Sequence, residues 1–276
     1  MCSFFPNQEV LIRTMTGLFL CCTEDKYMGY YSYGLDNNIY NANRGAILKY
    51  DKDLYFLNTH GEVVYYDIDE ILDRLKFKSE TWGIKNMQKR TFKFAQDCKD
   101  ICDGPGDLLY ALTSDGTIYN CPTKGRTERY PDINIAHELK GDKIYFTTIA
   151  ATGDFVCVAG YMPDNQHNSI QLVRANLAST LDGPIRTHAV SGHVHNLIGF
   201  KRKGINYFVA SCYYQEVFMY AVLNGKFSEC LRMVMDGPSA TKANHGLCFE
   251  YGDQDNFEKL IVFGQGYARI LQLKYD

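Results

Sequence analysis

The chain contains 276 residues, of which 46% are hydrophobic and 22% are charged, and this composition excludes an intrinsically disordered protein. Its formal net charge of −3 gives no overall attraction to nucleic acid or to an anionic membrane surface. No stretch rich in Pro, Gly and Ser resembles a linker, and all-β domains often reach this length as one unit, so we expect residues 1–276 to form a single domain.

The most apolar segment near the N-terminus, residues 17–22, is too short for the core of a signal peptide or for a membrane span. We therefore expect a chain with no membrane partner that resides in the cytoplasm or the nucleus. The 10 cysteines lie mostly in apolar, strand-like runs such as residues 155–158 and 247–249. They are predicted to be reduced and buried, because disulfide frameworks are typical of short secreted domains.

Three segments in the first half share one pattern. Residues 55–63 (Tyr-Phe-Leu-Asn-Thr-His-Gly-Glu-Val) align without gaps with residues 110–118 (Tyr-Ala-Leu-Thr-Ser-Asp-Gly-Thr-Ile). Both predict a strand, a tight turn and a second strand, with Gly61 and Gly116 supplying the positive φ that a two-residue hairpin turn needs. Residues 31–41 form a third copy, because an Asn at the turn adopts the same conformation.

A helical segment interrupts the strands between the second and third of these copies. Apolar residues from Ile68 to Leu75 recur at helical spacing, and residues 67–70 (Asp-Ile-Asp-Glu) are typical of a capping box. The pattern predicts a short helix at about 67–76. This helix would open a basic insertion between blades, at 67–95.

The second half contains three more predicted hairpins. They join residues 155–160 to 169–173, residues 207–211 to 216–222, and residues 260–263 to 268–273. Turn centres therefore fall near residues 37, 61, 116, 165, 215 and 266, and the last five recur every ~50 residues, as expected when a four-stranded sheet is the repeating unit. The fold class is thus predicted to be all-β, a single β-propeller of about six blades, with a range of five to seven. The short interval from 37 to 61 predicts either two hairpins in one blade or a truncated blade.

Residues 192–222 resemble a degenerate WD40 repeat. Gly192 and His193 match the Gly-His pair of that family, residues 209–211 (Val-Ala-Ser) are similar to its Leu-Ala-Ser strand, and Tyr220 stands where its Trp is found. The next unit repeats the theme at residues 245–249 and 262–273. The resemblance implies a propeller in which His193 has a structural role, although the chain contains no Trp-Asp dipeptide.

Cations and aromatic residues alternate in the predicted insertion, where Glu80 is the lone acid between residues 74 and 93. Such a segment binds either an acidic protein surface, with Trp82 as an anchor, or RNA, by counterion release and base stacking. A solvated loop without a specific role is the third interpretation. The candidate partner-binding residues are Arg74, Lys76, Lys78, Trp82, Lys85, Lys89, Arg90 and Lys93.

Residues that bind metals or act as nucleophiles do not form a recognisable constellation in the sequence. His193 and His195 face the same way on a strand but have no third ligand in view, and Cys98 and Cys102 lack a second pair at zinc spacing. No P-loop, dinucleotide fingerprint or nucleophile elbow occurs. We therefore predict no metal, no cofactor and no catalytic residue.

The sequence predicts a non-catalytic interaction scaffold, a propeller subunit of a larger assembly with protein partners. This step rests on architecture, because a propeller offers two broad faces and a rim with variable loops. An RNA-binding propeller that uses residues 74–93 is the first alternative. An enzyme that acts on a sugar or an ester at the axial funnel is the second.

Overall fold

The structure is a computed structural model, and its description covers a large part of the chain. The described residues are 2–4, 9–13, 18–22, 28–31, 47–50, 53–57, 62–67, 69–70, 90–93, 98–104, 108–113, 116–122, 133–134, 145–153, 155–162, 167–174, 185–186, 194–212, 216–234, 244–250, 259–264 and 267–272. Nearly all of them lie in antiparallel strands, so the all-β prediction is confirmed.

The described strands form six sheets, numbered here in chain order. Sheet 1 contains β1 (Cys2–Phe4), β2 (Glu9–Arg13), β3 (Leu18–Cys22) and β4 (Met28–Tyr31). Sheet 2 contains β5 (Ile47–Tyr50), β6 (Asp53–Leu57), β7 (Glu62–Asp67) and β8 (Arg90–Lys93). Sheet 3 contains β9 (Cys98–Gly104), β10 (Leu108–Thr113), β11 (Thr117–Pro122) and β12 (Ile133–Asn134).

Sheet 4 contains β13 (Tyr145–Thr152), β14 (Phe155–Met162), β15 (His167–Arg174) and β16 (Ile185–Arg186). Sheet 5 contains β17 (Val194–Arg202), β18 (Ile205–Cys212), β19 (Glu216–Leu223) and β20 (Lys226–Val234). Sheet 6 contains β21 (Asn244–Glu250), β22 (Lys259–Gly264) and β23 (Tyr267–Gln272). Each sheet is a meander, in which every strand pairs with the next along the chain.

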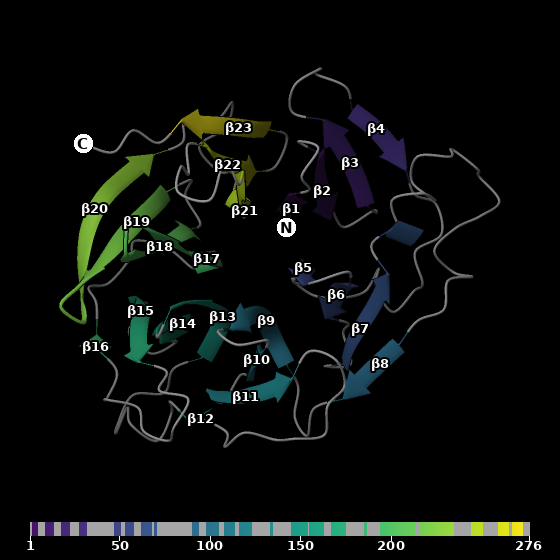
Figure 1. The fold of residues 1–276 in the computed structure, drawn as a ribbon. Coiled ribbons are helices and arrows are strands. Elements are labelled where there is room, and N and C mark those ends of the chain that lie inside the picture. The colour runs from purple at the N-terminus through teal and green to yellow at the C-terminus, as the bar shows by residue number, and fades with distance from the viewer. Residues whose placement is uncertain are drawn as a thin grey trace.

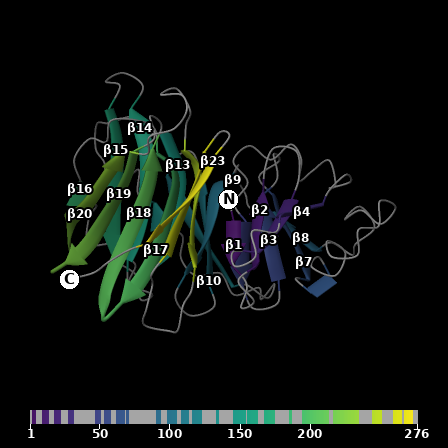
Figure 2. The ribbon, with the colours of Figure 1, turned by 90° about the horizontal axis from the view of Figure 1, so that it is seen from above.

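The six sheets are arranged in a ring around a central axis (Figure 1). The first strand of each sheet is innermost, and β1, β5, β9, β13, β17 and β21 each contact the innermost strand of the next sheet. Because β1 also contacts β21, the ring is closed between the first and last sheets. The view turned by 90° shows the same ring from the side (Figure 2). The predicted propeller architecture is confirmed.

The ~50-residue repeat has a structural explanation. The predicted turns near 61, 116, 165, 215 and 266 each join the second and third strands of a sheet, from sheet 2 to sheet 6. Residue 37 instead falls between β4 and β5, in the connection from sheet 1 to sheet 2 and outside the described residues. The equivalent turn of sheet 1 lies between β2 and β3, which the sequence analysis missed. Sheet 1 is therefore neither shared nor truncated, since its four strands fit between residues 2 and 31.

The turn at Gly116 is longer than predicted. Gly116 has a φ of 87°, as expected, and its N–H donates to the carbonyl oxygen of Thr113 at 3.0 Å. The Thr113 hydroxyl closes the loop further, because it donates to the Thr117 carbonyl at 2.9 Å and accepts from the Thr117 N–H at 3.1 Å. Since β10 ends at Thr113 and β11 begins at Thr117, the loop has three residues and ends in a positive-φ Gly, a common hairpin alternative to the two-residue turn.

The predicted helical insertion starts as expected but lies elsewhere in the architecture. The Glu70 N–H donates to Asp67 Oδ1 at 3.0 Å, which is the predicted capping interaction, and residues 69–70 are helical. Residues 71–89 lie outside the described part of the chain. The placement between blades is wrong, because β8 pairs with β7 and the segment therefore connects two strands of sheet 2.

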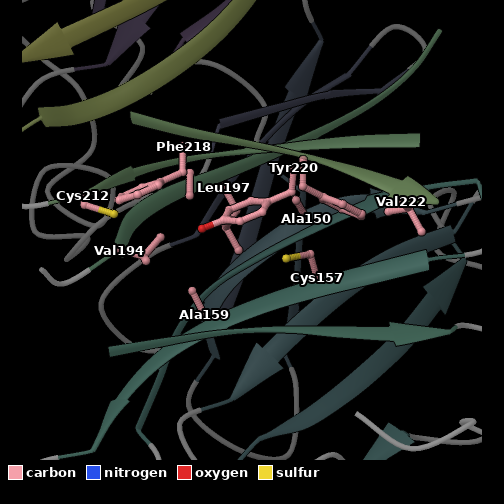
Figure 3. Close-up of a cluster of buried hydrophobic side chains, with 11 residues drawn as sticks. Ala150, Cys157, Ala159, Val194, Leu197, Cys212, Phe218, Tyr220 and Val222 are labelled. Carbon is pink, nitrogen blue, oxygen red and sulfur yellow. The ribbon is translucent and has the colours of Figure 1, made fainter. Parts of the chain in front are cut away.

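The core consists of side chains packed between neighbouring sheets. One cluster joins sheets 3 and 4, a second joins sheets 4 and 5, and a third joins sheets 5 and 6. In the second cluster, small residues of sheet 4 such as Cys157 and Ala159 face large residues of sheet 5 such as Phe218 and Tyr220 (Figure 3). Alternation of small and large side chains across the interface lets the two sheets approach closely at native packing density.

Candidate interaction surface

The predicted basic site is only partly described. Most of its residues lie outside the described ranges; they are Arg74, Lys76, Lys78, Trp82, Lys85 and Lys89. The other two lie in β8, the outermost strand of sheet 2, where Arg90 pairs with Tyr65 and Lys93 with Glu62. Only these two residues are thus placed on the outermost described strand of sheet 2, and the role of the basic site in binding stays a prediction.

The inner strands share a feature that the sequence analysis did not anticipate. Four consecutive innermost strands, β9, β13, β17 and β21, contain a β-bulge near their first residue. The extra residues are Lys99, Thr147, His195 and His245. The extra residues recur at regular spacing in the sequence, so sheets 3 to 6 repeat one irregularity, which increases the local twist of the inner strand.

Bulge residues and their neighbours connect adjacent sheets. Asp100 follows the bulge of β9, is 3% exposed, and accepts hydrogen bonds at Oδ2 from the Thr148 hydroxyl and from the Ile149 N–H of β13. Its Oδ1 accepts from the Ile101 N–H at 3.0 Å. The Thr147 hydroxyl shares its one proton between the carbonyl oxygens of Ala159 and Val194, at 3.2 and 3.3 Å, and thereby reaches sheet 5. Because both Asp100 oxygens accept hydrogen bonds, this carboxylate has a structural role.

Two polar residues that carry the WD40 resemblance lie in the middle strands of sheet 5. Ser211 lies in β18 and Tyr220 in β19, and both are buried. Among the described residues, the Ser211 hydroxyl has no hydrogen-bond partner, and neither does the Oδ1 atom of Asn196, which pairs with Ser211 across the strands. His193 lies outside the described residues, and His195 is the bulge residue of β17.

The side chains of five cysteines are described; all five are free thiols, and four of them are buried. Cys98, Cys102, Cys157 and Cys212 are buried, as predicted, whereas Cys230 is exposed. Burial raises the pKa of Cys157 and raises that of Cys212 to about 12. Both thiols are therefore protonated at neutral pH, a state that is poorly nucleophilic.

The described residues lack two further features. They contain no group of three or more His, Cys, Asp or Glu side chains that would hold a metal ion. Among them no helix is long and apolar enough to cross a bilayer.

The most accessible long strand of the described rim is β20, and we call its nine residues, Lys226–Val234, the β20 rim. None of its residues is buried, whereas seven of the eight residues of its neighbour β19 are. It is also the longest of the described outermost strands, since β4 and β8 have four residues, β12 and β16 have two, and β23 has six. A β-bulge at Cys230 divides it, and the Cys230 thiol donates to the Met219 carbonyl.

A fixed positive charge stands on the β20 rim. Arg232 Nη2 donates to Glu216 Oε1 at 2.7 Å, and the guanidinium carbon lies 5.2 Å from the centre of the Phe218 ring. The hydrogen bond to Glu216 raises the pKa of Arg232 further above its ordinary value. Although 54% of the Arg232 side chain is exposed, only 10% of the Glu216 side chain is. A buried carboxylate and an aromatic face thus hold an accessible guanidinium in one orientation.

The aromatic side chain under Arg232 belongs to a longer row. Phe218 is stacked on Tyr220 with ring centres 6.2 Å apart, and Tyr220 contacts Phe227 of β20 at 5.3 Å. Phe227 in turn meets the edge of Phe208 at 5.9 Å. The guanidinium is therefore supported by a platform that continues into the core between sheets 4 and 5, which limits its movement.

Sequence reasoning missed this site for a specific reason. The period-two alternation of residues 216–222 places Glu216, Phe218 and Tyr220 on one face of a strand. The partner of Phe218 is Arg232, however, only because the bulge at Cys230 shifts the register of β20 by one residue. A regular hairpin would have placed a different residue of β20 beside Phe218.

The fold defines the class of protein. Neither a protein-family model nor a curated protein sequence matches the chain. Solved structures of WD40-type β-propellers do resemble it over nearly its whole length, so the predicted resemblance to WD40-like propellers is confirmed at the level of the fold.

Three of these structures illustrate the likeness. The N-terminal domain of Nup159 has a TM-score of 0.58 at 10% identity, over 98% of this chain and 74% of that one. The WD40 domain of Toxoplasma gondii coronin has a TM-score of 0.54 at 9% identity, over 99% and 69% of the two chains. KlAtg21, solved in complex with the coiled coil of AgAtg16, has a TM-score of 0.56 at 8% identity, over 99% and 80%.

Proposed function

We propose that the protein is a non-catalytic interaction scaffold, a propeller subunit of a larger assembly that binds protein partners in the cytoplasm or the nucleus. The observation that carries the proposal is the combination of a closed, rigid ring with an accessible rim on which a charged side chain is held in place. Rigid surfaces bind partners at a lower cost in conformational entropy than mobile ones.

Several similar propellers were solved in complexes with other proteins, which supports the proposal. KlAtg21 was solved with the coiled coil of AgAtg16, and an S. cerevisiae structure contains Dbp5 bound to Nup159. A further similar chain comes from the mitotic checkpoint complex. These proteins share the fold at low sequence identity, so what carries over is the use of a propeller as a binding surface and not the identity of a partner.

The buried polar groups near the axis favour a scaffold over an enzyme. A catalytic acid or base must reach the substrate, and a carboxylate held by the protein's own donors or a buried thiol does not. Asp100 is engaged by donors from β9 and β13, and the described thiols close to it and in the adjacent cluster are buried. Asp100 and Thr147, two side chains that link inner strands near the axis, therefore support the fold.

The test is purification of the full chain from its native cells with a small affinity tag, followed by chemical cross-linking and mass spectrometry. We expect a stable set of protein partners that survives ribonuclease treatment, with cross-links to lysines of the rim. Recovery of a monomer without partners would contradict the scaffold. Partners that disappear with ribonuclease and with charge reversal of Lys85, Lys89 and Arg90 would instead support the RNA-binding alternative.

A further inference from the structure

The outer edge of β20 is suited to pair with another strand. The edge strand of a sheet presents backbone N–H and C=O groups that an extended segment can use, and proteins usually keep such strands short or covered. β20 is the outermost described strand of sheet 5, with nine residues of which none is buried. Its inner neighbour β19 is almost wholly buried, so the sheet beneath the edge is rigid.

The bulge at Cys230 restricts where a further strand can pair. Regular pairing requires an uninterrupted register, which the bulge breaks between Glu229 and Leu231. On the C-terminal side of the bulge, residues 231–234 pair in regular register with residues 216–219 of β19. Arg232 and Val234 are two residues apart there, and so they share one face of the strand.

The face of β20 that contains Arg232 and Val234 presents a cation beside an apolar side chain. Val234 is 59% exposed, so its aliphatic side chain is accessible to a partner. Arg232 uses one N–H for Glu216, and its remaining donors have no acceptor among the described residues. A guanidinium held by an ion pair and a ring loses little rotamer entropy when it binds a second carboxylate.

We propose that an extended segment of a protein partner pairs with the outer edge of β20 between residues 231 and 234. A carboxylate of the segment binds the Arg232 guanidinium, and an aliphatic side chain two residues along packs against Val234. This proposal rests on the proposed function, a protein-interaction scaffold. It adds the surface that binds the partner and the kind of partner segment that binds there. Cross-strand pairs of opposite charge and of aliphatic residues are the side-chain contacts that select a strand at such an edge.

A selection experiment tests the proposal without a known partner. A phage-displayed library of random linear peptides, about nine residues long, is selected against the full chain, and against the double variant Glu216→Gln/Arg232→Met. The double variant removes both charges together, because loss of Arg232 alone would leave Glu216 buried without its cation. Lys226→Met is the matched control, since it removes an exposed cation from the other end of β20.

The expected result has two parts. Peptides enriched on the wild-type chain carry Asp or Glu two positions from Val, Ile or Leu, and they bind the double variant at least about tenfold more weakly but bind Lys226→Met unchanged. In hydrogen exchange, the enriched peptide slows amide exchange in residues 231–234, and the same peptide with its acid replaced by the amide does so less. This second measurement uses only the wild-type chain, so it stands even if the double variant does not fold.

Several outcomes would overturn the proposal. Enrichment of peptides without an acid, protection of a different strand, or equal binding to the double variant would each do so. So would a chain that sediments as a dimer and whose residues 231–234 are already protected from hydrogen exchange without peptide. Partners recovered from cells that still bind the double variant would refute this site and leave the scaffold function intact. A chain that recovers no partner in either form would refute the scaffold itself.

Discussion

Two turns of sheet 5 have the same backbone geometry but different residues. Lys203 and Gly204 join β17 to β18, and Asn224 and Gly225 join β19 to β20. All four have positive φ, at 45° and 79° in the first turn and 53° and 73° in the second, which defines two-residue turns of type I′. Asn tolerates this conformation better than Lys, because its short side chain forms local hydrogen bonds.

Reciprocal substitutions at the first turn positions are expected to have opposite effects. Lys203→Asn should raise the free energy of unfolding by about 0.5–1 kcal/mol, and Asn224→Lys should lower it by a similar amount. Both residues are exposed, so packing does not obscure the comparison. Urea unfolding of the two single variants and of the double swap measures this, and the double swap should be near neutral. Changes of the same sign in both single variants would contradict the argument.

At the scale of the element, hydrogen bonds between innermost strands differ in chemistry from one sheet to the next. Sheets 3 and 4 are joined by the buried carboxylate of Asp100, while sheets 4 and 5 are joined by the neutral hydroxyl of Thr147. Hydrogen bonds to a charged group contribute more than neutral ones, and a buried donor left without a partner is costly.

Asp100→Asn is therefore expected to destabilise the protein by about 2–4 kcal/mol, because the amide offers one acceptor atom where the carboxylate offers two. Either Ile101 or the Thr148–Ile149 pair then meets a donor instead of an acceptor. Thr147→Val, the matched change between sheets 4 and 5, should cost about 1 kcal/mol. Thermal and urea unfolding compare the two. If Asp100→Asn and Thr147→Val lowered the free energy of unfolding equally, the Asp100 link between sheets 3 and 4 would not be the stronger of the two.

Some strands and hairpins could be predicted from the sequence, whereas others could not. The middle hairpin of sheets 2 to 6 was predictable, because two apolar strands flank a turn marked by Gly or by a polar loop. β12 and β16 were not predictable, because a strand of two residues is too short to show an alternation of apolar and polar side chains. β8 was missed because its Arg-Thr-Phe-Lys sequence was assigned to the basic insertion, and only its pairing with β7 identifies it as a strand. The Arg232 site depends on a bulge, which leaves no periodic signal.

At the scale of the whole molecule, the ring is held by side chains that must stay neutral. Between sheets 4 and 5 the core contains Cys157, Cys212 and Tyr220, and between sheets 3 and 4 it contains Tyr110. Burial raises the pKa of each, to about 12 for Cys212 and for Tyr110. Burial of an anion without a paired cation is unfavourable, so ionisation of these groups is linked to separation of the sheets.

This linkage predicts loss of stability at alkaline pH. A thiol ionises with a pKa of 9.0 in the unfolded chain and of about 12 at Cys212, so its contribution is complete below pH about 9 and is lost as the pH rises towards 12. Each such group adds a slope of up to about 1.4 kcal/mol per pH unit to the fall in the free energy of unfolding. Urea unfolding between pH 8 and 11 measures the slope. Cys212→Ala, although less stable at pH 8 because of the small cavity, should show a shallower fall, and an unchanged slope would mean that Cys212 is not among the groups that drive it.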